Sequence, residues 1–149
     1  MKNFYDPGVA DELKRRIAAL RPDSTRQWGK MNPAQAAAHL ASALEMAVGD
    51  HMPPTMFLGR VFGRVGKWLL FRNDKPMVRN SPTVPELVMA DPRDLERERK
   101  RLLSLVDRLA VGPSACTNVP HSFFGAMTTD EWAILLYKHL DHHLRQFGV

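Results

Sequence analysis

This sequence has little cysteine, no long apolar run and no convincing strand-like alternation of apolar and polar residues. Cys116 is its single cysteine, so neither an intramolecular disulfide nor a cysteine-based zinc cage can form within the chain. No stretch approaches the roughly 20 apolar residues of a membrane span, and the first residues contain no apolar run like that of a signal peptide. These absences predict a cytoplasmic protein without a membrane partner.

Length and charge place the chain among basic proteins of one domain. It has 149 residues, with 21 Lys and Arg against 16 Asp and Glu, and a formal net charge of +5. A single domain over residues 1–149 is expected from this length. Much of the excess charge lies between Arg60 and Arg79, where Asp74 is the only acid, and it favours anionic partners such as phosphates or acidic lipid. Aromatic residues with base-stacking spacing are missing there, so nucleic acid is not an expected partner.

Helical periodicity and capping residues predict an all-α fold. Asn32-Pro33-Ala34-Gln35 and Thr128-Thr129-Asp130-Glu131 each have the pattern of a capping box, in which a side chain at the helix start pairs with one three residues on. Apolar residues at helical spacing follow both. Four principal helices are predicted, over about residues 8–20, 33–48, 91–111 and 129–147.

The segment between the second and third of these helices is ambiguous. Residues 57–71 have apolar residues at helical spacing but also Gly59, Gly63 and Gly66, each of which costs about 1 kcal/mol in a helix relative to alanine. Either the backbone packs closely against a neighbour there, or the segment is partly irregular. Prolines at 76, 82, 85 and 92 predict a long ordered crossover over residues 73–91. Four helices with one long crossover connection predict a four-helix bundle, whose interior can hold a metal site.

Two histidines of the last helix lie in the middle of its apolar face. At about 100° per residue, His139 and His143 both fall within about 20° of Trp132. The charged residues on the opposite side are Lys138, Asp141 and Arg145. A buried polar group without a partner costs about 1–3 kcal/mol, whereas two imidazoles at i and i+4 can converge on one cation.

His39 is the candidate third ligand. It shares a face of the helix over residues 33–48 with alanines, whose small side chains allow another helix to approach closely. Three imidazoles without cysteine suit a divalent transition metal, with Zn or Ni ahead of Fe, Mn or Cu, rather than Mg or Ca. Three protein ligands leave a position for water or substrate, which is typical of a catalytic site. Histidines that face a core can equally be satisfied polar residues, so the spacing alone leaves both interpretations open.

Several motifs resemble those of the DinB-like superfamily. Residues 28–35, Trp-Gly-Lys-Met-Asn-Pro-Ala-Gln, followed by Ala38-His39-Leu40, are similar to its second-helix entry. Residues 139–146 resemble its closing H-x3-H-x2-Q signature. The stretch 121–132 and the ending Gln146-Phe147-Gly148 are similar to a DinB-related branch of undefined function.

This resemblance implies a fold, a metal site and a range of activities. The fold is a four-helix bundle, and the site is a three-histidine metal centre carried over to His39, His139 and His143. Some members of the superfamily are metal-dependent transferases that use low-molecular-weight thiols. Others are isomerases or hydrolase-like proteins, or have no known activity.

Four further residues are candidates for the surroundings of the site: His121, Gln146, Trp28 and Trp132. His121 could line the mouth of a pocket or be an ordinary loop residue. Gln146 could hydrogen-bond a ligand ring or lie on the surface at the helix end. The tryptophans could wall the site or belong to the core. Asp141 and Glu45 point away from the histidines on their helices and are not expected to be ligands.

Two classes of function follow. The first is an enzyme, a metal-dependent transferase or hydrolase of a small-molecule substrate. A thiol is its first candidate co-substrate because no acid is placed as a general base. The alternative is a binding or structural protein, in which the metal staples helices and the basic segment 60–79 docks an anionic partner. A fourth protein ligand such as His121 or His142 would favour the staple. The sequence leaves the metal, the substrate and the oligomeric state open, and a homodimer is compatible with it.

Overall fold

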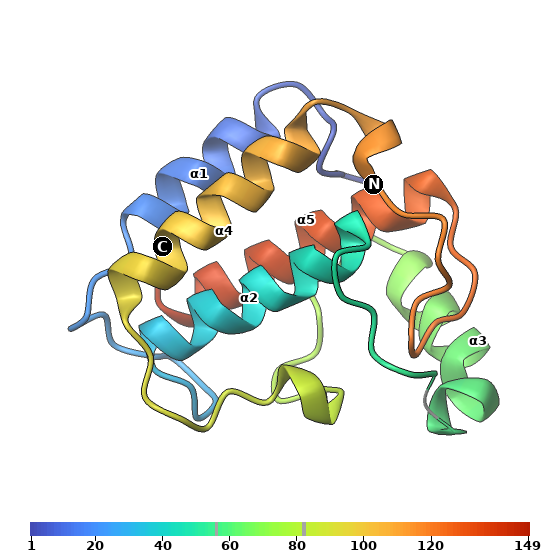
Figure 1. Ribbon diagram of the computed structural model, residues 1–149, viewed down its shortest axis with the longest axis horizontal. Coiled ribbons are helices and arrows are strands. Elements are labelled where there is room, and N and C mark those ends of the chain that lie inside the picture. Colours follow the sequence, from blue (N-terminus) through green and yellow to red (C-terminus); the bar gives the residue numbers. More distant parts are fainter. Residues whose placement is uncertain (56, 82) are drawn as a thin grey trace.

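The computed structural model describes residues 1–55, 57–81 and 83–149, and its regular elements there are helices joined by irregular connections (Figure 1). Within these ranges it contains no strand, and His121 and Gly125 form an isolated bridge. The prediction of an all-α fold is confirmed. None of the helices in this described part combines the length and the hydropathy needed to cross a membrane. The elements are α1 (Val9–Ala18), α2 (Pro33–Val48), α3 (Phe57–Phe71), η1 (Pro85–Leu87), α4 (Leu95–Ala110), η2 (Pro113–Ala115) and α5 (Thr129–Gln146).

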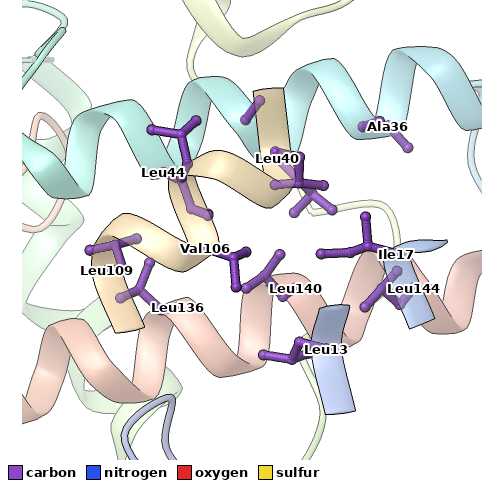
Figure 2. Packing of buried hydrophobic residues seen from close by; sticks show 14 of the residues in the cluster. Leu13, Ile17, Ala36, Leu40, Leu44, Val106, Leu109, Leu136, Leu140 and Leu144 are labelled. Atoms are coloured by element: carbon purple, nitrogen blue, oxygen red, sulfur yellow. The ribbon is translucent and has the colours of Figure 1, made fainter. Parts of the chain in front are cut away.

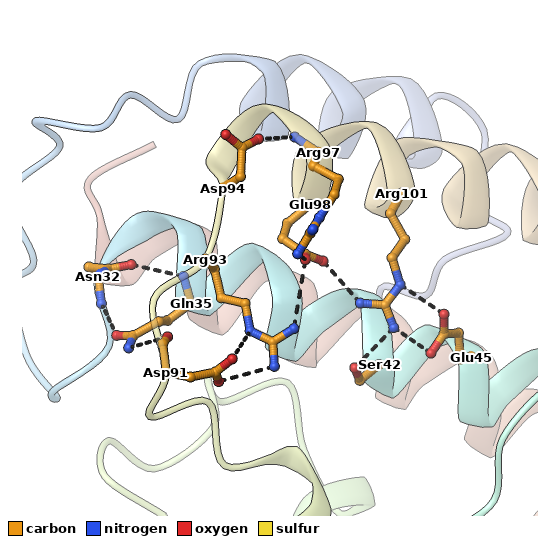
Figure 3. A network of polar contacts seen from close by, with 10 residues as sticks. All are labelled: Asn32, Gln35, Ser42, Glu45, Asp91, Arg93, Asp94, Arg97, Glu98 and Arg101. Carbon is orange, nitrogen blue, oxygen red and sulfur yellow. Dashed lines mark hydrogen bonds and ion pairs between the residues drawn. The ribbon is translucent and has the colours of Figure 1, made fainter.

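Both predicted capping boxes form. The Asn32 side chain accepts a hydrogen bond from the Gln35 backbone at 2.9 Å, and the Gln35 side chain accepts one from the Asn32 backbone at 3.0 Å (Figure 3). Thr128 and Glu131 make the same reciprocal pair at the start of α5. Because each box satisfies backbone donors that the first turn leaves free, it sets where the helix begins.

Two predicted helix bounds are wrong. α4 begins at Leu95 rather than at residues 91–92, since the Asp94 side chain accepts from the Arg97 backbone at 2.7 Å and caps the helix there. Proline at 92 also disfavours helical backbone at the residue before it. α1 ends at Ala18, two residues before the predicted end.

One apolar core lies between α1, α2, α4 and α5. α4 packs on α2 and α1, and α5 packs on the same two helices. Figure 2 shows core side chains from all four helices pointing toward one another, among them Leu13, Leu40, Val106 and Leu140. The small residues Ala36, Ala37 and Ala41 on α2 are fully buried and bring that helix close to its neighbours.

A polar network joins α2 and α4 along one edge of this core (Figure 3). Arg101 donates to both carboxylate oxygens of Glu45, at 2.8 and 2.5 Å, and its third nitrogen lies 3.0 Å from Glu98. Glu98 is only 2% exposed, and hydrogen bonds from Arg101 and Arg97 hold its pKa below the usual value although burial opposes them. Glu45 is thereby directed toward Arg101, in agreement with its exclusion as a ligand.

α3 lies beside α5, to one side of the other helices (Figure 1). Its glycine face meets the loop before α5, since a Cβ on Gly59 would lie 2.6 Å from the Phe123 carbonyl oxygen. Residues 57–71 are therefore helical, and the glycines allow the close backbone contact that was one of the two predicted alternatives. The connection from α3 to α4 contains only the short η1 helix within its described residues, as the prolines predict; Pro82 lies outside those residues.

Lys138 is the clearest error of the helical-wheel prediction. The helical projection puts it on the side opposite the apolar face, but it is only 6% exposed. Its ammonium donates to the carbonyl oxygens of Leu70 and Asn73, at 2.7 and 2.6 Å. The end of α3 covers this side of α5 and offers the free carbonyls that every helix end leaves. Burial lowers the pKa of Lys138 from its ordinary value.

Replacing Gly63 by alanine is expected to destabilise the protein. In an open helix this change stabilises by about 1 kcal/mol, but here the new Cβ would collide with the Phe123 carbonyl oxygen. Overpacking of this kind costs about 1–3 kcal/mol. After the gain in helix propensity is subtracted, a net loss of up to about 2 kcal/mol is expected in urea denaturation. Gly66→Ala is the control, because its nearest neighbours are ring carbons at 3.0 and 3.3 Å that can move. A stabilised Gly63→Ala protein would contradict the close contact.

Candidate metal centre

Three imidazoles from two helices converge at one point. His39 comes from α2, and His139 and His143 come from successive turns of α5. One nitrogen from each ring lies within 4.8 Å of the other two. The closest approach joins His39 Nε2 and His139 Nε2, 3.0 Å apart. His39 and His143 are buried and His139 is half-buried. The structure therefore brings together the three histidines that the sequence singled out.

The backbone carbonyl of Leu87 sets the tautomer of His39. It lies 2.8 Å from His39 Nδ1. A carbonyl oxygen can only accept a hydrogen bond, so Nδ1 carries the proton and Nε2 presents its lone pair. That lone pair faces His139 Nε2, and the two nitrogens need a proton or a cation between them. Histidines that bind metals usually donate their other N–H in this way.

Gln146 sets the tautomer of His143 through a chain of two hydrogen bonds. Its Nε2 donates to the Trp28 carbonyl oxygen at 2.8 Å, which fixes the orientation of the amide. Its Oε1 then lies 2.8 Å from His143 Nδ1, which must donate. Gly29, at φ 78°, is needed for this arrangement because a side chain there would collide with Gln146 Nε2. Gln146 is thus a buried partner of His143 and not a surface residue.

These donors fit a tetrahedral or more open transition-metal site. With metal–nitrogen bonds of about 2.0–2.1 Å, two imidazole nitrogens of a tetrahedral zinc site lie about 3.3 Å apart. The observed 3.0 Å between His39 and His139 is close to this spacing. Two of the three rings already hold the tautomer that leaves Nε2 free. The set contains imidazole alone, which suits Zn, Ni, Cu and Fe rather than Mg or Ca.

Burial keeps the three rings neutral. Desolvation is the largest cause that lowers the pKa of His39, and it lowers the pKa of His143 to about 3. The pKa of His139 is also lowered, first by desolvation and then by its histidine neighbours. A metal requires imidazoles in the neutral form. In the folded chain the three imidazoles are therefore neutral and can bind a metal without first losing a proton.

A cavity of about 560 Å³ opens beside the cluster. All three histidines line it, together with Trp28, Gln146 and Lys30. Residues of the crossover form much of its wall, Met77, Leu87 and Met89 among them. No Asp or Glu occurs among the described residues that line it. The cavity is the size of a small-molecule site. Its lining combines apolar side chains with polar ones such as Gln35, Asn80 and Thr83.

The other candidate site residues lie in different parts of the structure. Trp28 is a wall of the cavity, whereas Trp132 is only 3% exposed, belongs to the core and does not line it. His121 Nδ1 accepts from the backbone N–H groups of Phe123 and Phe124, at 3.1 and 3.2 Å. It therefore orders its own loop, and burial lowers its pKa to about 4. Neither His121 nor His142 joins the cluster of converging nitrogens among the described residues.

His142 and Asp141 contact different parts of the protein. The His142 ring contacts Trp28, with centroids 5.5 Å apart, and lines the cavity wall. Asp141 pairs with Arg16 of α1 at 2.9 Å, away from the histidines, as its position on the helix predicts.

The side chains of the basic segment 60–79 lie in different parts of the structure. Arg60 and Arg64 are exposed on α3 and do not line the cavity. Lys67 pairs with Glu131 at 2.8 Å. Arg79 lies over the Trp28 ring at 4.3 Å and lines a small neighbouring pocket of about 30 Å³. Lys30 lines the cavity itself, and Arg79 and Arg145 line the small pocket beside it. Neither Lys30 nor the cavity wall formed by the crossover was predicted from the sequence.

Gln146→Leu is expected to weaken metal binding about 10–100-fold, the usual effect of removing a hydrogen-bond partner of a ligand histidine. The leucine leaves His143 Nδ1 without its acceptor and frees the ring to rotate. The measurement is competition for zinc with a chromophoric chelator. Gln27→Leu, at an exposed amide nearby, is the matched control. Equal affinities in the two variants would show that Gln146 does not orient His143.

Comparison with known proteins identifies a family but no individual relative. No curated protein and no solved structure gives a significant match to the chain. Residues 8–148 match a family described as a protein of unknown function (DUF1569). That match includes His39, His139, His143 and Gln146. The chain therefore belongs to the DUF1569 family.

Proposed function

We propose that the protein binds one divalent transition metal through His39, His139 and His143 and uses it as an open catalytic site. The observation that carries this is the 3.0 Å approach of two imidazole nitrogens at the wall of a cavity. We also propose that α1, α2, α4 and α5 are the four-helix bundle of the DinB-like superfamily. The closing H-x3-H-x2-Q motif supports this, because its two histidines and its glutamine meet in the same cluster.

The position of the cluster favours an enzyme over a binding protein in which the metal only links helices. A staple is expected to have a fourth protein ligand and no access for solvent or substrate. Only three histidines converge among the described residues, and they do so on the lining of the cavity. When bound, a metal supplies a Lewis acid and lowers the pKa of a coordinated water or thiol. The chain's own residues hold the rings neutral and in place and enclose the substrate.

Metal content tests the proposal first. Protein purified without a nickel column is expected to contain about one equivalent of metal per chain, with zinc or nickel ahead of iron, manganese or copper. Elemental analysis after dialysis measures it. Protein that neither contains nor takes up any of these metals would contradict the proposal.

A low-molecular-weight thiol is the co-substrate that the cavity favours. No carboxylate lines it to serve as a general base for water. A thiol needs less help, since its free pKa is near about 8.5 and a metal can deprotonate it. Lys30 and the nearby Arg79 can attract the carboxylates that such thiols carry. Arg64 and Lys67, although also basic, are not in a position to do so.

Cobalt-substituted protein provides the test of the thiol. A sulfur-to-metal charge-transfer band is expected with at least one cellular thiol, and Lys30→Ala is expected to weaken that binding. Lys100→Ala, an exposed lysine on α4, is the matched control. No band with any thiol, together with turnover of a simple ester or amide, would instead favour a hydrolase.

A further inference from the structure

α3 presents an unusual apolar surface to the outside. Its seven most exposed apolar residues are between 50% and 77% exposed, whereas Gly59 and Gly63 are buried. At about 100° per residue these seven side chains fall within an arc of about 140°. They are Phe57, Leu58, Val61, Phe62, Val65, Trp68 and Leu69. Single exposed apolar residues are ordinary, but a continuous patch of this kind marks an interaction surface.

Positive charge borders this apolar arc. On the same helical projection, Arg60 and Arg64 fall next to its Phe57 edge, and both are exposed. Arg72 follows directly after the helix and lies over the Trp68 ring at 4.6 Å. The sequence contains no acid between His51 and Asn73. The other side of α3 contacts the rest of the protein. Its glycines pack against the loop at Phe123, and Lys67 pairs with Glu131.

We infer that α3 is a docking helix for an anionic membrane surface. A helix that lies in the bilayer interface has this composition: tryptophan, phenylalanine and leucine on one face and arginines at its border. The apolar arc would enter the level of the acyl chains while Arg60 and Arg64 extend back to the phosphates. Such contact requires no membrane-crossing helix. It differs from the expectation of no membrane partner, which rested on the lack of a span.

Charge favours lipid over a second copy of the chain. Pairing two α3 helices face to face and antiparallel would bring two arginine borders together, with no acid on either helix to offset them. An anionic bilayer complements both properties of the surface, since it offers an apolar interior and negative headgroups. Each arginine near the surface is expected to raise the affinity for such a bilayer about fivefold.

Vesicle binding tests the inference. The full chain is expected to co-sediment with vesicles of equimolar phosphatidylglycerol and phosphatidylcholine and not with phosphatidylcholine alone, and binding should fall as salt is raised. The Arg60→Gln/Arg64→Gln variant should bind about 25-fold more weakly. Val65→Asp should remove most binding, because it places a charge in the apolar arc.

Matched controls separate this surface from general charge and exposure. Arg15→Gln/Lys100→Gln removes the same charge from exposed sites on α1 and α4, and Val111→Asp adds an acid at a residue that is 80% exposed beyond α4. Both should bind like the unchanged protein. Bound protein should also show a blue shift in tryptophan emission that Trp68→Phe removes.

Two results would overturn the inference. One is equal binding by Val65→Asp and Val111→Asp, or no binding to the anionic vesicles at all. The other is a dimer in light scattering that Val65→Asp dissociates while vesicle binding is absent, which would assign α3 to a second copy. Neither result depends on the metal site, so the proposed function is tested separately.

Discussion

Replacing His143 by alanine is expected to reduce the bound transition metal from about one equivalent per chain to none. His143 supplies one of three converging nitrogens, and Gln146 already holds its ring in the binding tautomer. Two remaining imidazoles would leave a weak site that dialysis empties. His139→Ala is expected to have the same effect, because its Nε2 forms the 3.0 Å approach to His39. Elemental analysis of dialysed protein measures the result.

His142→Ala is the matched control for this experiment. It removes an imidazole from the next position of the same helix, which lines the cavity but does not join the cluster. It is expected to retain the metal. Circular dichroism must show that each variant is folded, so that loss of metal reports the site. Stoichiometric metal in folded His143→Ala protein would exclude His143 as a ligand.

The metal-free protein is expected to lose stability steeply as the pH falls below about 6.5. In the unfolded chain histidine has an ordinary pKa near 6.5, whereas the buried His39 has a lowered pKa and His143 one of about 3. Their contribution to stability is complete above the unfolded value. It is lost as the pH falls toward the folded values, because only the unfolded chain takes up the protons. Each histidine that is protonated only in the unfolded chain contributes about 1.4 kcal/mol per pH unit to this fall. The lowered pKa values of His121, His139 and His142 therefore add to the slope.

Urea denaturation at a series of pH values measures this slope. His143→Phe removes one of these groups and is expected to reduce the slope by about 1.4 kcal/mol per pH unit. His51→Gln, at an exposed histidine after α2, is the control that should leave it unchanged. A stability that is flat between about pH 6.5 and 4 would show that the rings are not buried and neutral in the fold.

The same burial changes how metal binding should depend on pH. Exposed histidines lose a metal as the pH falls through about 6.5, because protons compete for the ring nitrogens. In the folded chain His39, His139 and His143 are already neutral there, since each pKa is lowered. Metal-dependent stabilisation is therefore expected to persist below pH 6.5 and to disappear nearer the folded values. A loss centred on about pH 6.5 would indicate exposed ligands.

Local patterns in the sequence determined the helix starts at Asn32 and Thr128 and the shared face of His139 and His143. Capping boxes and the i, i+4 spacing act within one or two turns, so they can be recognised without a fold. The same spacing correctly directed Asp141 and Glu45 away from the histidines. A resemblance in the closing motif added Gln146 as a candidate, and the sequence left its role open.

Only the tertiary structure decided the rest of the site. The acceptor for His39 lies 48 residues away at Leu87, and the carbonyl that orients Gln146 lies 118 residues away at Trp28. Lys138 is buried because α3 covers it, and Trp28 rather than Trp132 lines the cavity. Periodicity along one helix shows which side chains share a face, but it carries no information on which distant segment covers that face. Packing of remote segments supplies the partners, sets the tautomers and encloses the cavity.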